Sequence, residues 1–577
     1  MALSVHAQYS GRSFTEKIVY DNTRSIDRET AEMDSFTISP NGRHFAYFTY
    51  VSAEVMRSEE KRIKEALREK ANVDAGDLAK TISRLTTGRG TRIVWDGEKK
   101  FLHPVYVESS LIFSPDGSHL AYVAWEKTNF WVVVDGTEHE KHYAGVTDLI
   151  FSSNGKSVAY WTSFYTRPGS KTTRFSVVVN GREQKSYKEI LENPFSKRAV
   201  FQTPETCEPT GFRPRLLFDA TGDRLAYAAT DGTNSYVIVD GQEAGPYADF
   251  GDIGTEEYDI ADLNFSPDGK HFAYAAWRSN QSILVWDKTI HTGKPMVVAG
   301  SLIFSPDSQH IAYIRKGKTQ AVYLDGERQT TYREIKKHSL TFSPDSKQLG
   351  YVAVNNDGRA CVVINGKEQK KFPGIAKGPV FSSDSQRIAY VAQGARKKEN
   401  ANRREEFLIV DGNEENVAGE IVLGPTFSPD SKRLAYVATR NSLQRVVVDG
   451  KEVGSTDEVK FFWFSPNGKR YAFIASRKKA GYDSLVVDGQ LHPFRGNPST
   501  FRFTDDSKHY LVVNRDATTL LNTFVEVDGR RGRVYEKIFP ACRPAIHFDG
   551  VNQFHYFGER GGKIYFTEEK LVDNNQP

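Results

Sequence analysis

Short apolar runs alternate with polar corners along most of the chain. In the stretch Asn264–Trp277, NFSPDGKHFAYAAW, an apolar run ends at a Ser-Pro-Asp-Gly corner and a longer apolar run follows. A third run, such as WVVVDG at Trp131–Gly136, ends at Asp-Gly and leads into a polar segment. Valine-rich runs bounded by Asp-Gly or Asn-Gly are a strong hairpin signal. The second and third runs are apolar on both faces, which is typical of a strand in a sheet packed between two other sheets.

This pattern recurs along the chain in twelve units. The apolar residues that precede the corner are Ile38, Phe113, Phe151, Phe218, Phe265, Phe304, Phe342, Phe381, Phe427, Phe464, Phe503 and Phe548. Most neighbouring units are just under 40 residues apart, and longer gaps mark insertions. A period of roughly 40 to 45 residues is that of one four-stranded propeller blade. The sequence therefore predicts an all-β protein, a β-propeller built of about twelve four-stranded blades.

The repeat also resembles a known family. The run FSPDGK, followed by an apolar residue, Ala-Tyr and a further apolar strand, resembles the TolB-like branch of WD-repeat-like β-propellers. Phe113–Ala124 and Phe265–Ala276 carry the resemblance most closely, and it extends over about residues 35–570. TolB-like rings have six blades, so the resemblance implies two six-bladed rings, which we place at residues 1–336 and 337–577. Other divisions, or one large ring, are also compatible with the even spacing around residue 337.

Two segments fall outside the repeat. The stretch FTEKIVYD, Phe14–Asp21, is strand-like, and almost no chain remains after KIYFTEEK for a last fourth strand. We therefore expect Phe14–Asp21 to pair with C-terminal strands and to complete a terminal blade. Within the first unit, residues 52–89 carry apolar residues at helical spacing, which predicts a helical insertion of two helices; these residues are Ile63, Leu67, Leu78, Ile82 and Leu85.

The order of antiparallel strands predicts where the loops emerge. The Ser-Pro-Asp-Gly corner and the later Asp-Gly corner of a unit are expected on one face, and the remaining two connections on the other. The long insertions, at residues 52–89, 186–215, 249–262 and 394–406, all belong to that second face. Variable loops on a rigid scaffold are where binding usually occurs. We therefore expect the loop-rich face to bind a partner.

An acidic loop is the candidate binding site on this face. The loop has no Lys or Arg and could receive a basic segment of a partner; its acidic residues are Asp249, Asp252, Glu256, Glu257, Asp259 and Asp262. Its spacing does not match a calcium-binding EF-hand loop, and a solvated acidic loop is the alternative. A basic run at Arg396–Arg404 lacks the interleaved aromatic residues that stack on bases. We read it as an exposed loop and expect no nucleic-acid partner.

Histidines recur at one position of the repeat, two residues after the Gly or Ser of the corner. They are His44, His119, His271, His310 and His509. In other units Ser, Gln or Arg takes this position, so we interpret it as a surface position rather than as a metal ligand. No metal and no cofactor is expected.

The composition of the chain limits which kinds of partner and compartment are expected. The 577 residues include 77 basic and 73 acidic side chains, a net charge of +4 that favours neither nucleic acid nor membrane. Three cysteines, Cys207, Cys361 and Cys542, lie far apart and are expected as buried thiols. There is no apolar run of membrane-spanning length and no intact signal peptide. If the resemblance extends to compartment, the protein is periplasmic in a bacterium; otherwise it is cytoplasmic.

The sequence favours a non-enzymatic scaffold that binds a protein or peptide. It contains no GxSxG nucleophile motif and no phosphate-binding P-loop. The innermost strands, such as LIF, LTF and FWF, carry little titratable chemistry. The alternatives are a lyase or hydrolase that acts on sugars or polyanions in a channel, and a structural module of an envelope or surface assembly. The oligomeric state is left open.

Overall fold

The computed structural model describes most of the chain. The described residues are 4–9, 12–21, 30–51, 90–103, 110–126, 129–139, 143–165, 173–191, 216–248, 260–278, 281–292, 296–396, 404–417, 419–477, 482–516, 522–539 and 545–571. The chain divides into two compact units. Unit 1 comprises Met1–Glu192, Val200–Ala244 and Val534–Pro577, and unit 2 comprises Asn193–Ala199 and Gly245–Arg533.

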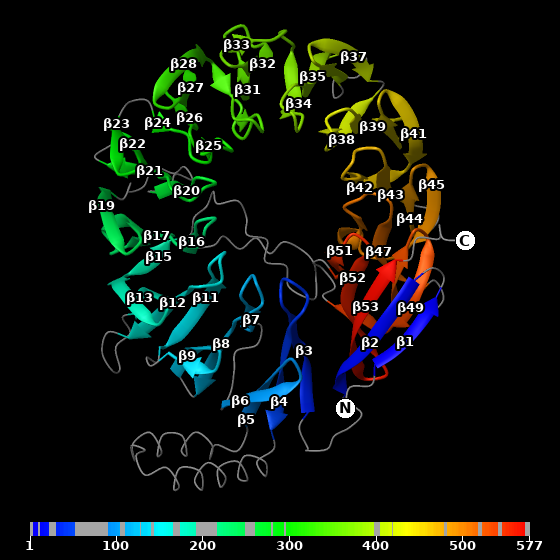
Figure 1. Ribbon diagram of the computed structural model, residues 1–577. Coiled ribbons are helices and arrows are strands. Elements are labelled where there is room, and N and C mark those ends of the chain that lie inside the picture. Colours follow the sequence, from blue (N-terminus) through cyan, green and yellow to red (C-terminus); the bar gives the residue numbers. More distant parts are fainter. Residues whose placement is uncertain are drawn as a thin grey trace. The chain divides into compact units, whose positions relative to one another are not determined.

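Five sheets lie wholly or mostly in unit 1 (Figure 1). The sheet that contains both chain ends has β1 (Ser4–Tyr9), β2 (Arg12–Asp21), β53 (Lys563–Leu571) and β52 (Gln553–Arg560), with β50 (Lys537–Phe539) and β51 (His547–Gly550) both paired to β52. The next has β3 (Thr30–Ile38), β4 (Phe45–Val51), β5 (Gly90–Trp95) and β6 (Glu98–His103). The others are β7 (Ile112–Phe113), β8 (Leu120–Glu126), β9 (Asn129–Val134) and β10 (Thr137–Glu138); β11 (Gly145–Phe151), β12 (Val158–Tyr165), β13 (Thr173–Val179) and β14 (Arg182–Tyr187); and β15 (Glu189–Leu191), β16 (Leu216–Phe218), β17 (Leu225–Thr230), β18 (Asn234–Val239) and β19 (Gln242–Ala248).

Seven sheets lie wholly or mostly in unit 2. The first three are β20 (Ile260–Phe265), β21 (Phe272–Arg278), β22 (Gln281–Trp286) and β23 (Thr289–Thr292); β24 (Met296–Val297), β25 (Ile303–Phe304), β26 (Ile311–Lys316), β27 (Gln320–Leu324) and β28 (Glu327–Tyr332); and β29 (Glu334–Ile335), β30 (Thr341–Phe342), β31 (Leu349–Val354), β32 (Ala360–Ile364) and β33 (Lys367–Glu368). The next two are β34 (Gly374–Phe381), β35 (Ile388–Arg396), β36 (Arg404–Val410) and β37 (Asn413–Val417), and β38 (Glu420–Phe427), β39 (Leu434–Arg440), β40 (Leu443–Val448) and β41 (Lys451–Thr456). The last two are β42 (Glu458–Phe464), β43 (Tyr471–Ser476), β44 (Asp483–Val487) and β45 (Gln490–Phe494), and β46 (Arg502–Phe503), β47 (Tyr510–Arg515), β48 (Thr523–Val527) and β49 (Arg530–Tyr535).

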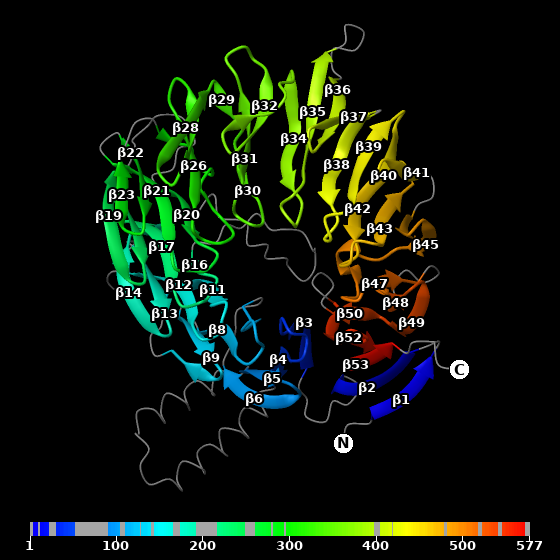
Figure 2. The same ribbon diagram turned by 45° about the horizontal axis from the view of Figure 1, so that its top comes forward.

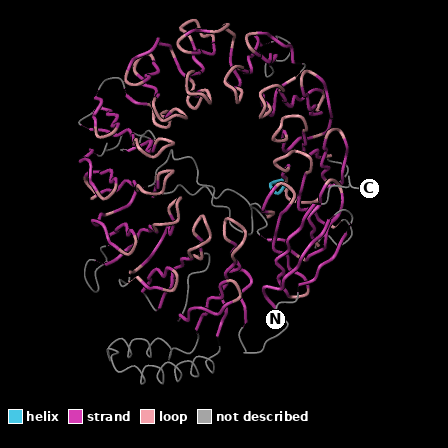
Figure 3. Tube along the Cα trace, viewed as in Figure 1, coloured by secondary structure: helices cyan, strands magenta, loops and turns pink. Residues whose placement is uncertain are grey.

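These twelve antiparallel sheets confirm the prediction of an all-β protein built of four-stranded propeller blades. Where a sheet has a fifth strand, as with β24 and β25, two short strands pair with the same neighbour and together form the first strand of the blade. Among the described residues the only helix is a single 3-10 turn, Pro498–Thr500 (Figure 3). No helix in this described part is long and apolar enough to cross a membrane.

The second and third strands of each blade hold the core. Along β8, Ala121, Tyr122, Val123 and Ala124 are all buried, so both faces of the strand are covered. The same holds for β31 and for Val132 and Val133 of β9. Small alanines and buried tyrosines alternate in these strands, which lets neighbouring sheets pack closely. This packing is the reason that the strands read as continuous apolar runs in the sequence.

The predicted pairing of the N-terminal segment is confirmed. Strand β2 pairs antiparallel with β53, with Lys17 opposite Phe566 and Ile18 opposite Tyr565, and the two strands lie side by side in both views (Figures 1 and 2). Strand β1 then adds to the free side of β2. The last blade of the sequence is thus completed by residues from the beginning of the chain.

Buried charges connect β2 to the C-terminal strands. The Arg12 guanidinium donates to the Glu569 carboxylate at 3.1 Å, and both side chains are 4% exposed. Glu16, also buried, pairs with Arg560 at 3.1 Å and accepts a hydrogen bond from the Tyr535 hydroxyl. Burial raises the pKa of Glu569, while Arg12 acts in the opposite direction. Each buried carboxylate therefore depends on a partner from the other end of the chain.

Replacing Arg12 by Met should loosen this sheet, because Glu569 then remains buried without a cation. Removing one member of a buried ion pair costs about 3–5 kcal/mol, whereas replacing both members by apolar residues is often close to neutral. We expect Arg12→Met to lower the thermal unfolding midpoint and to speed amide hydrogen exchange in Arg12–Asp21. The double variant Arg12→Met with Glu569→Met should recover most of the loss. Equal exchange rates in the single variant and the wild type would contradict this role.

The Asp-Gly corner is a closed hydrogen-bonded turn, as predicted. In the corner of Asn264–Trp277, the Ser266 hydroxyl donates to Asp268 at 2.6 Å and the Lys270 amide donates to the same carboxylate at 3.1 Å. Gly269 takes the left-handed conformation, with φ of +73°. The hydrogen bond from Ser266, followed by that from the Lys270 amide, lowers the pKa of Asp268. The Asp268 carboxylate thus accepts hydrogen bonds that hold its own turn together.

Serine in the glycine position links neighbouring blades of unit 2. Five corners have Ser there, each with φ between 62° and 67°. In each case the Ser hydroxyl accepts a hydrogen bond of 2.9–3.0 Å from the amide of the corner Asp or Asn of the preceding blade; the serines are Ser308, Ser346, Ser385, Ser431 and Ser507. The exchange of Gly for Ser in the repeat therefore has a physical reason. The hydrogen bond offsets the strain of the left-handed backbone.

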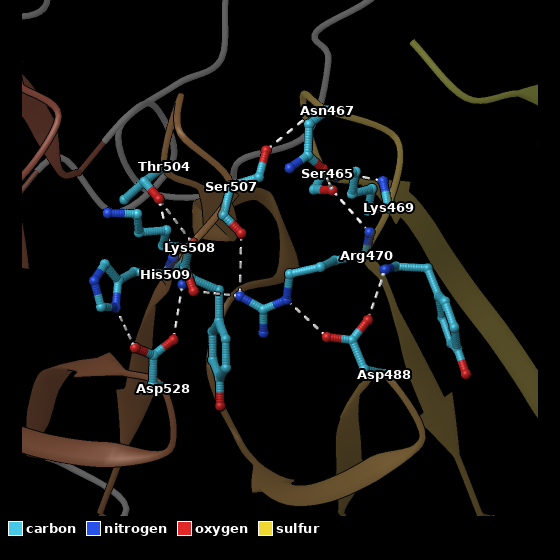
Figure 4. Close-up of polar contacts among 12 residues, drawn as sticks. Ser465, Asn467, Lys469, Arg470, Asp488, Thr504, Ser507, Lys508, His509 and Asp528 are labelled. Atoms are coloured by element: carbon cyan, nitrogen blue, oxygen red, sulfur yellow. Dashed lines mark hydrogen bonds and ion pairs between the residues drawn. The ribbon is translucent and has the colours of Figure 1, made fainter. Parts of the chain in front are cut away.

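The second corner of a blade is tied to the first, which places both on one face as expected. Arg470 donates to Asp488 at 2.7 Å, and the other Asp488 oxygen accepts the Tyr471 amide at 3.0 Å (Figure 4). Arg470 also donates to carbonyl oxygens in the next corner, at Ser507 and Lys508. The histidines at this position make the same bond, for example His509 to Asp528 at 2.5 Å (Figure 4). The repeated histidine position is thus a structural hydrogen-bonding position.

The link made by Ser346 can be measured with two substitutions. Ser346→Ala removes the bond to the Asp307 amide and keeps a side chain at a φ of 65°. We expect a loss of about 1 kcal/mol, the net value of one hydrogen bond. Ser346→Gly loses the same bond but relieves the backbone strain, so its thermal midpoint should lie above that of the Ala variant. An Ala variant as stable as the wild type would show that the bond contributes nothing.

Several predictions fall on residues outside the described part. The helical insertion at 52–89 and the basic run around residues 397–403 belong to this group, as do Cys207 and Cys542. Cys361 is buried as expected, and burial raises the pKa of its thiol to about 11. The arrangement in two six-bladed rings divided after residue 336 stays a prediction.

Candidate functional site

The predicted acidic site is described at one of its six residues. Asp249, Asp252, Glu256, Glu257 and Asp259 lie outside the described residues. Asp262, the sixth, lies on β20 and is 2% exposed. Its carboxylate accepts hydrogen bonds from the amides of Gly300 at 2.7 Å and Leu302 at 3.4 Å. Burial raises the pKa of Asp262 to about 6 against the opposing effect of these bonds. Asp262 therefore holds the turn at residues 300–302.

A pocket of about 700 Å³ lies in unit 1, where the sheet of both chain ends meets the blade of β3–β6. One wall comes from β2, β52 and β53, namely Thr15, Lys17, Ile18, Val19, Phe557, Phe566 and Glu568. The other comes from the two corners of the β3–β6 blade, namely Arg43, His44, Phe45, Asp96 and Gly97. The pocket is therefore on the side of its blade that carries these two tight corners.

The strand register explains which side chains meet in the pocket. Thr15 lies opposite Glu568, and Lys17 lies opposite Phe566. On the other side of β53, Phe566 lies opposite Phe557, with ring centroids 5.1 Å apart. Residues two apart on a strand share a face, so Thr15, Lys17, Phe566 and Glu568 form one surface. This surface has a charged edge and an aromatic floor.

Some charged side chains of the pocket are bonded to a carboxylate, and others make no hydrogen bond or ion pair with described residues. His44 is bonded to Asp96 at 2.8 Å, and Arg43 is bonded to Asp549 at 2.6 Å. In contrast, the Lys17 ammonium and the Glu568 carboxylate make no hydrogen bond or ion pair within the described residues. Lys17 is exposed and Glu568 is half-buried. Among the described residues, the pocket thus offers one cation and one anion without a bonded partner beside the aromatic floor.

Two stacked histidines support the corner that carries Arg43. The rings of His547 and His555 lie 5.3 Å apart and nearly parallel, and His555 is bonded to Asp549 at 2.7 Å. Gly42 lies against both rings, so close that a Cβ atom there would be 2.3 Å from His547. Burial, with a smaller contribution from His555, lowers the pKa of His547 to about 4. Asp549 then joins His555 to Arg43 at the rim of the pocket.

Sequence reasoning missed this pocket. It expected binding on the loop-rich face and treated His44 as one of several equivalent surface histidines. The one available signal was the predicted pairing of Phe14–Asp21 with C-terminal strands, which brings Lys17 near the end of the chain. The register of that pairing, which decides that Lys17 and Glu568 share a face, was not predicted.

Comparisons with known proteins found similarity to solved structures only, which include β-propellers. No protein-family model matches the sequence, and no curated protein matches it either. The solved structures that resemble it include a eukaryotic initiation factor, with a TM-score of 0.32 and 13% identity over 60% of this chain and 88% of that one. The β-propeller domain of the Trilobed protease from Pyrococcus furiosus has a TM-score of 0.25 and 16% identity, over 47% of this chain and 95% of that one. TolB from Acinetobacter baumannii has a TM-score of 0.22 and 15% identity, over 51% of this chain and 78% of that one. Identities this low concern the fold alone.

The histidine stack predicts a loss of stability in acid. The pKa of His547 is lowered from 6.5 to about 4 in the folded protein, so the unfolded chain binds more protons between these pH values. Stability should therefore fall as the pH drops from 6.5 to 4, by up to about 3 kcal/mol from this group. The thermal midpoint measured at pH 7, 5.5 and 4.5 should fall less steeply in His547→Gln than in the wild type.

His338 provides the matched control for this experiment. It is exposed on a turn with a φ of 67°, a conformation that Asn accepts readily. We expect the pH dependence of His338→Asn to follow that of the wild type. If His547→Gln also followed the wild type, the buried stack would not be the origin of the acid sensitivity.

Proposed function

We propose that this protein is a non-enzymatic binding protein that takes up a peptide segment of a protein partner in the pocket between β2, β53 and the corners of the β3–β6 blade. The observation that carries the proposal is the pair Lys17 and Glu568, which bond to no other described side chain or backbone group, beside the aromatic floor of Phe557 and Phe566. Binding sites typically combine an apolar surface with a few polar groups that set orientation. Peptides supply both kinds of group.

The walls of the pocket support recognition rather than chemistry. They are paired strands and hydrogen-bonded corners, so little order has to be gained when a ligand binds. Phe45 and Phe557 continue into a buried aromatic cluster with Phe36 and Phe539, which holds the floor in place. His44 and Arg43, the groups best suited to proton transfer or charge stabilisation, are already bonded to Asp96 and Asp549.

The acidic loop remains a second part of this proposal. Asp262 already accepts two backbone hydrogen bonds. A basic segment of a partner would therefore be received by Asp249, Asp252, Glu256, Glu257 and Asp259.

Selection from a displayed random peptide library tests the proposal. The library is enriched on the wild-type protein, and the recovered peptides are measured against two Trp variants. Thr15→Trp fills the pocket from β2, whereas Thr137→Trp adds the same side chain at an exposed position of β10 outside it. We expect Thr15→Trp to weaken binding by roughly tenfold or more, equivalent to about 1.4 kcal/mol, and Thr137→Trp to leave it unchanged.

Two results would count against the proposal. A library without any enriched sequence would show that the chain does not bind peptides of this size. Enriched peptides that bind Thr15→Trp as tightly as the wild type would place peptide binding elsewhere on the protein. Both variants are first compared with the wild type by thermal unfolding, so that a loss of binding reports on the pocket rather than on folding.

A further inference from the structure

The two free charges of the pocket have a defined spacing. Lys17 lies opposite Phe566 and Thr15 lies opposite Glu568, so Lys17 and Glu568 are diagonal neighbours on adjacent strands. Diagonal neighbours in an antiparallel pair are about 7–8 Å apart. In an extended peptide, side chains two residues apart point to the same side and are about 6.6–6.8 Å apart. The spacing of the two charges thus matches that of alternate residues on an extended chain.

We propose that the pocket recognises an extended peptide segment that carries an acidic and a basic side chain two residues apart. The acidic side chain pairs with Lys17, the basic side chain pairs with Glu568, and an apolar side chain on the same face of the peptide rests on the aromatic floor. This inference rests on the proposed peptide binding and names the sequence class of the ligand.

The other charged groups of the pocket favour Lys17 and Glu568 as the selecting pair. Arg43 and His44 are each held by a carboxylate, at 2.6 Å and 2.8 Å. A ligand charge that approached them would have to compete with Asp549 or Asp96. Lys17 and Glu568 have no such partner within the described part of the chain, so pairing with them requires no existing bond to break.

The aromatic floor of the pocket is the reason that the peptide ligand needs an apolar side chain. Phe566 is flanked by Lys17 on one side and Phe557 on the other, and it precedes Glu568 by two residues on the same face of β53. An apolar ligand side chain next to the two charges on the same face of the peptide therefore reaches Phe566 directly. Phe45 and Val19 line the same space from the opposite wall and from β2. Burial of such a side chain adds affinity, while the charges set the register.

A set of synthetic peptides and a charge exchange test the inference. The probe is fluorescein-labelled, amidated Leu-Ser-Asp-Ser-Lys-Ser-Leu, which presents Asp, Lys and both Leu side chains on one face. The first control replaces Asp by Asn and Lys by Gln, and the second replaces both Leu by Ser. Binding is measured by fluorescence anisotropy at low and high salt on the wild type, Lys17→Glu, Glu568→Lys and the double variant.

We expect the probe to bind the wild type and each control peptide to bind about fivefold or more weakly, with the charge effect reduced at high salt. Each single charge reversal should weaken binding of the probe, because one ligand charge then meets a like charge. The double variant again presents one cation and one anion at the same spacing and should recover binding. Recovery distinguishes direct charge pairing from damage to the pocket.

The outcomes separate this inference from the proposed function. If library peptides bind in the pocket but the neutral control binds as tightly as the probe, the charge requirement is wrong and peptide binding stands. The inference is also wrong if the double variant binds no better than the single variants. Absence of any peptide binding at the pocket would overturn the proposed function itself.

Discussion

The pairing of β2 with β53 is the interaction on which the rest of unit 1 depends. It joins a strand near the start of the chain to the last described strand, and it is held by the buried pair Arg12–Glu569 and by Glu16 with Arg560. The same pairing sets the register that places Lys17 beside Phe566 and Thr15 beside Glu568. A shift by one residue would turn Lys17 to the other face of the sheet. The proposed peptide pocket and the completion of the last blade therefore have a common cause.

The corners of the blades show why a frequent acidic residue is not a site here. A corner Asp such as Asp268 accepts hydrogen bonds from the Ser of its own corner and from the backbone, and an Asp of the second corner such as Asp287 accepts a strand amide and bonds to a His or Arg. In unit 2, Ser residues at the glycine position carry the connection on to the preceding blade. The polar residues of this face hold the corners in place. The pocket differs because two of its charged side chains, Lys17 and Glu568, make no hydrogen bond or ion pair with other described residues.

Sequence reasoning predicted the blades because their signals are local. Apolar runs, Asp-Gly corners and a regular spacing each depend on a few neighbouring residues, and together they repeat twelve times. It also predicted the partner of Phe14–Asp21, because an unpaired strand at one end and a missing strand at the other can only be satisfied together. It did not find the Ser links between corners, the role of Asp262 or the pocket. Each of these features depends on contacts between residues that are far apart in the sequence.

The sequence by itself determined that the chain is all-β, that its units are four-stranded blades and that both corners of a blade share a face, because strand alternation and turn chemistry act over a few residues. Only the tertiary structure decided which charges remain free. The net charge and the motif list treat Arg43, His44, Lys17 and Glu568 alike. Arg43 receives its carboxylate partner, Asp549, from the neighbouring blade, and His44 receives Asp96 from the second corner of its own blade. Lys17 and Glu568 make no such bond to another described residue, and that difference is the basis of the proposed recognition.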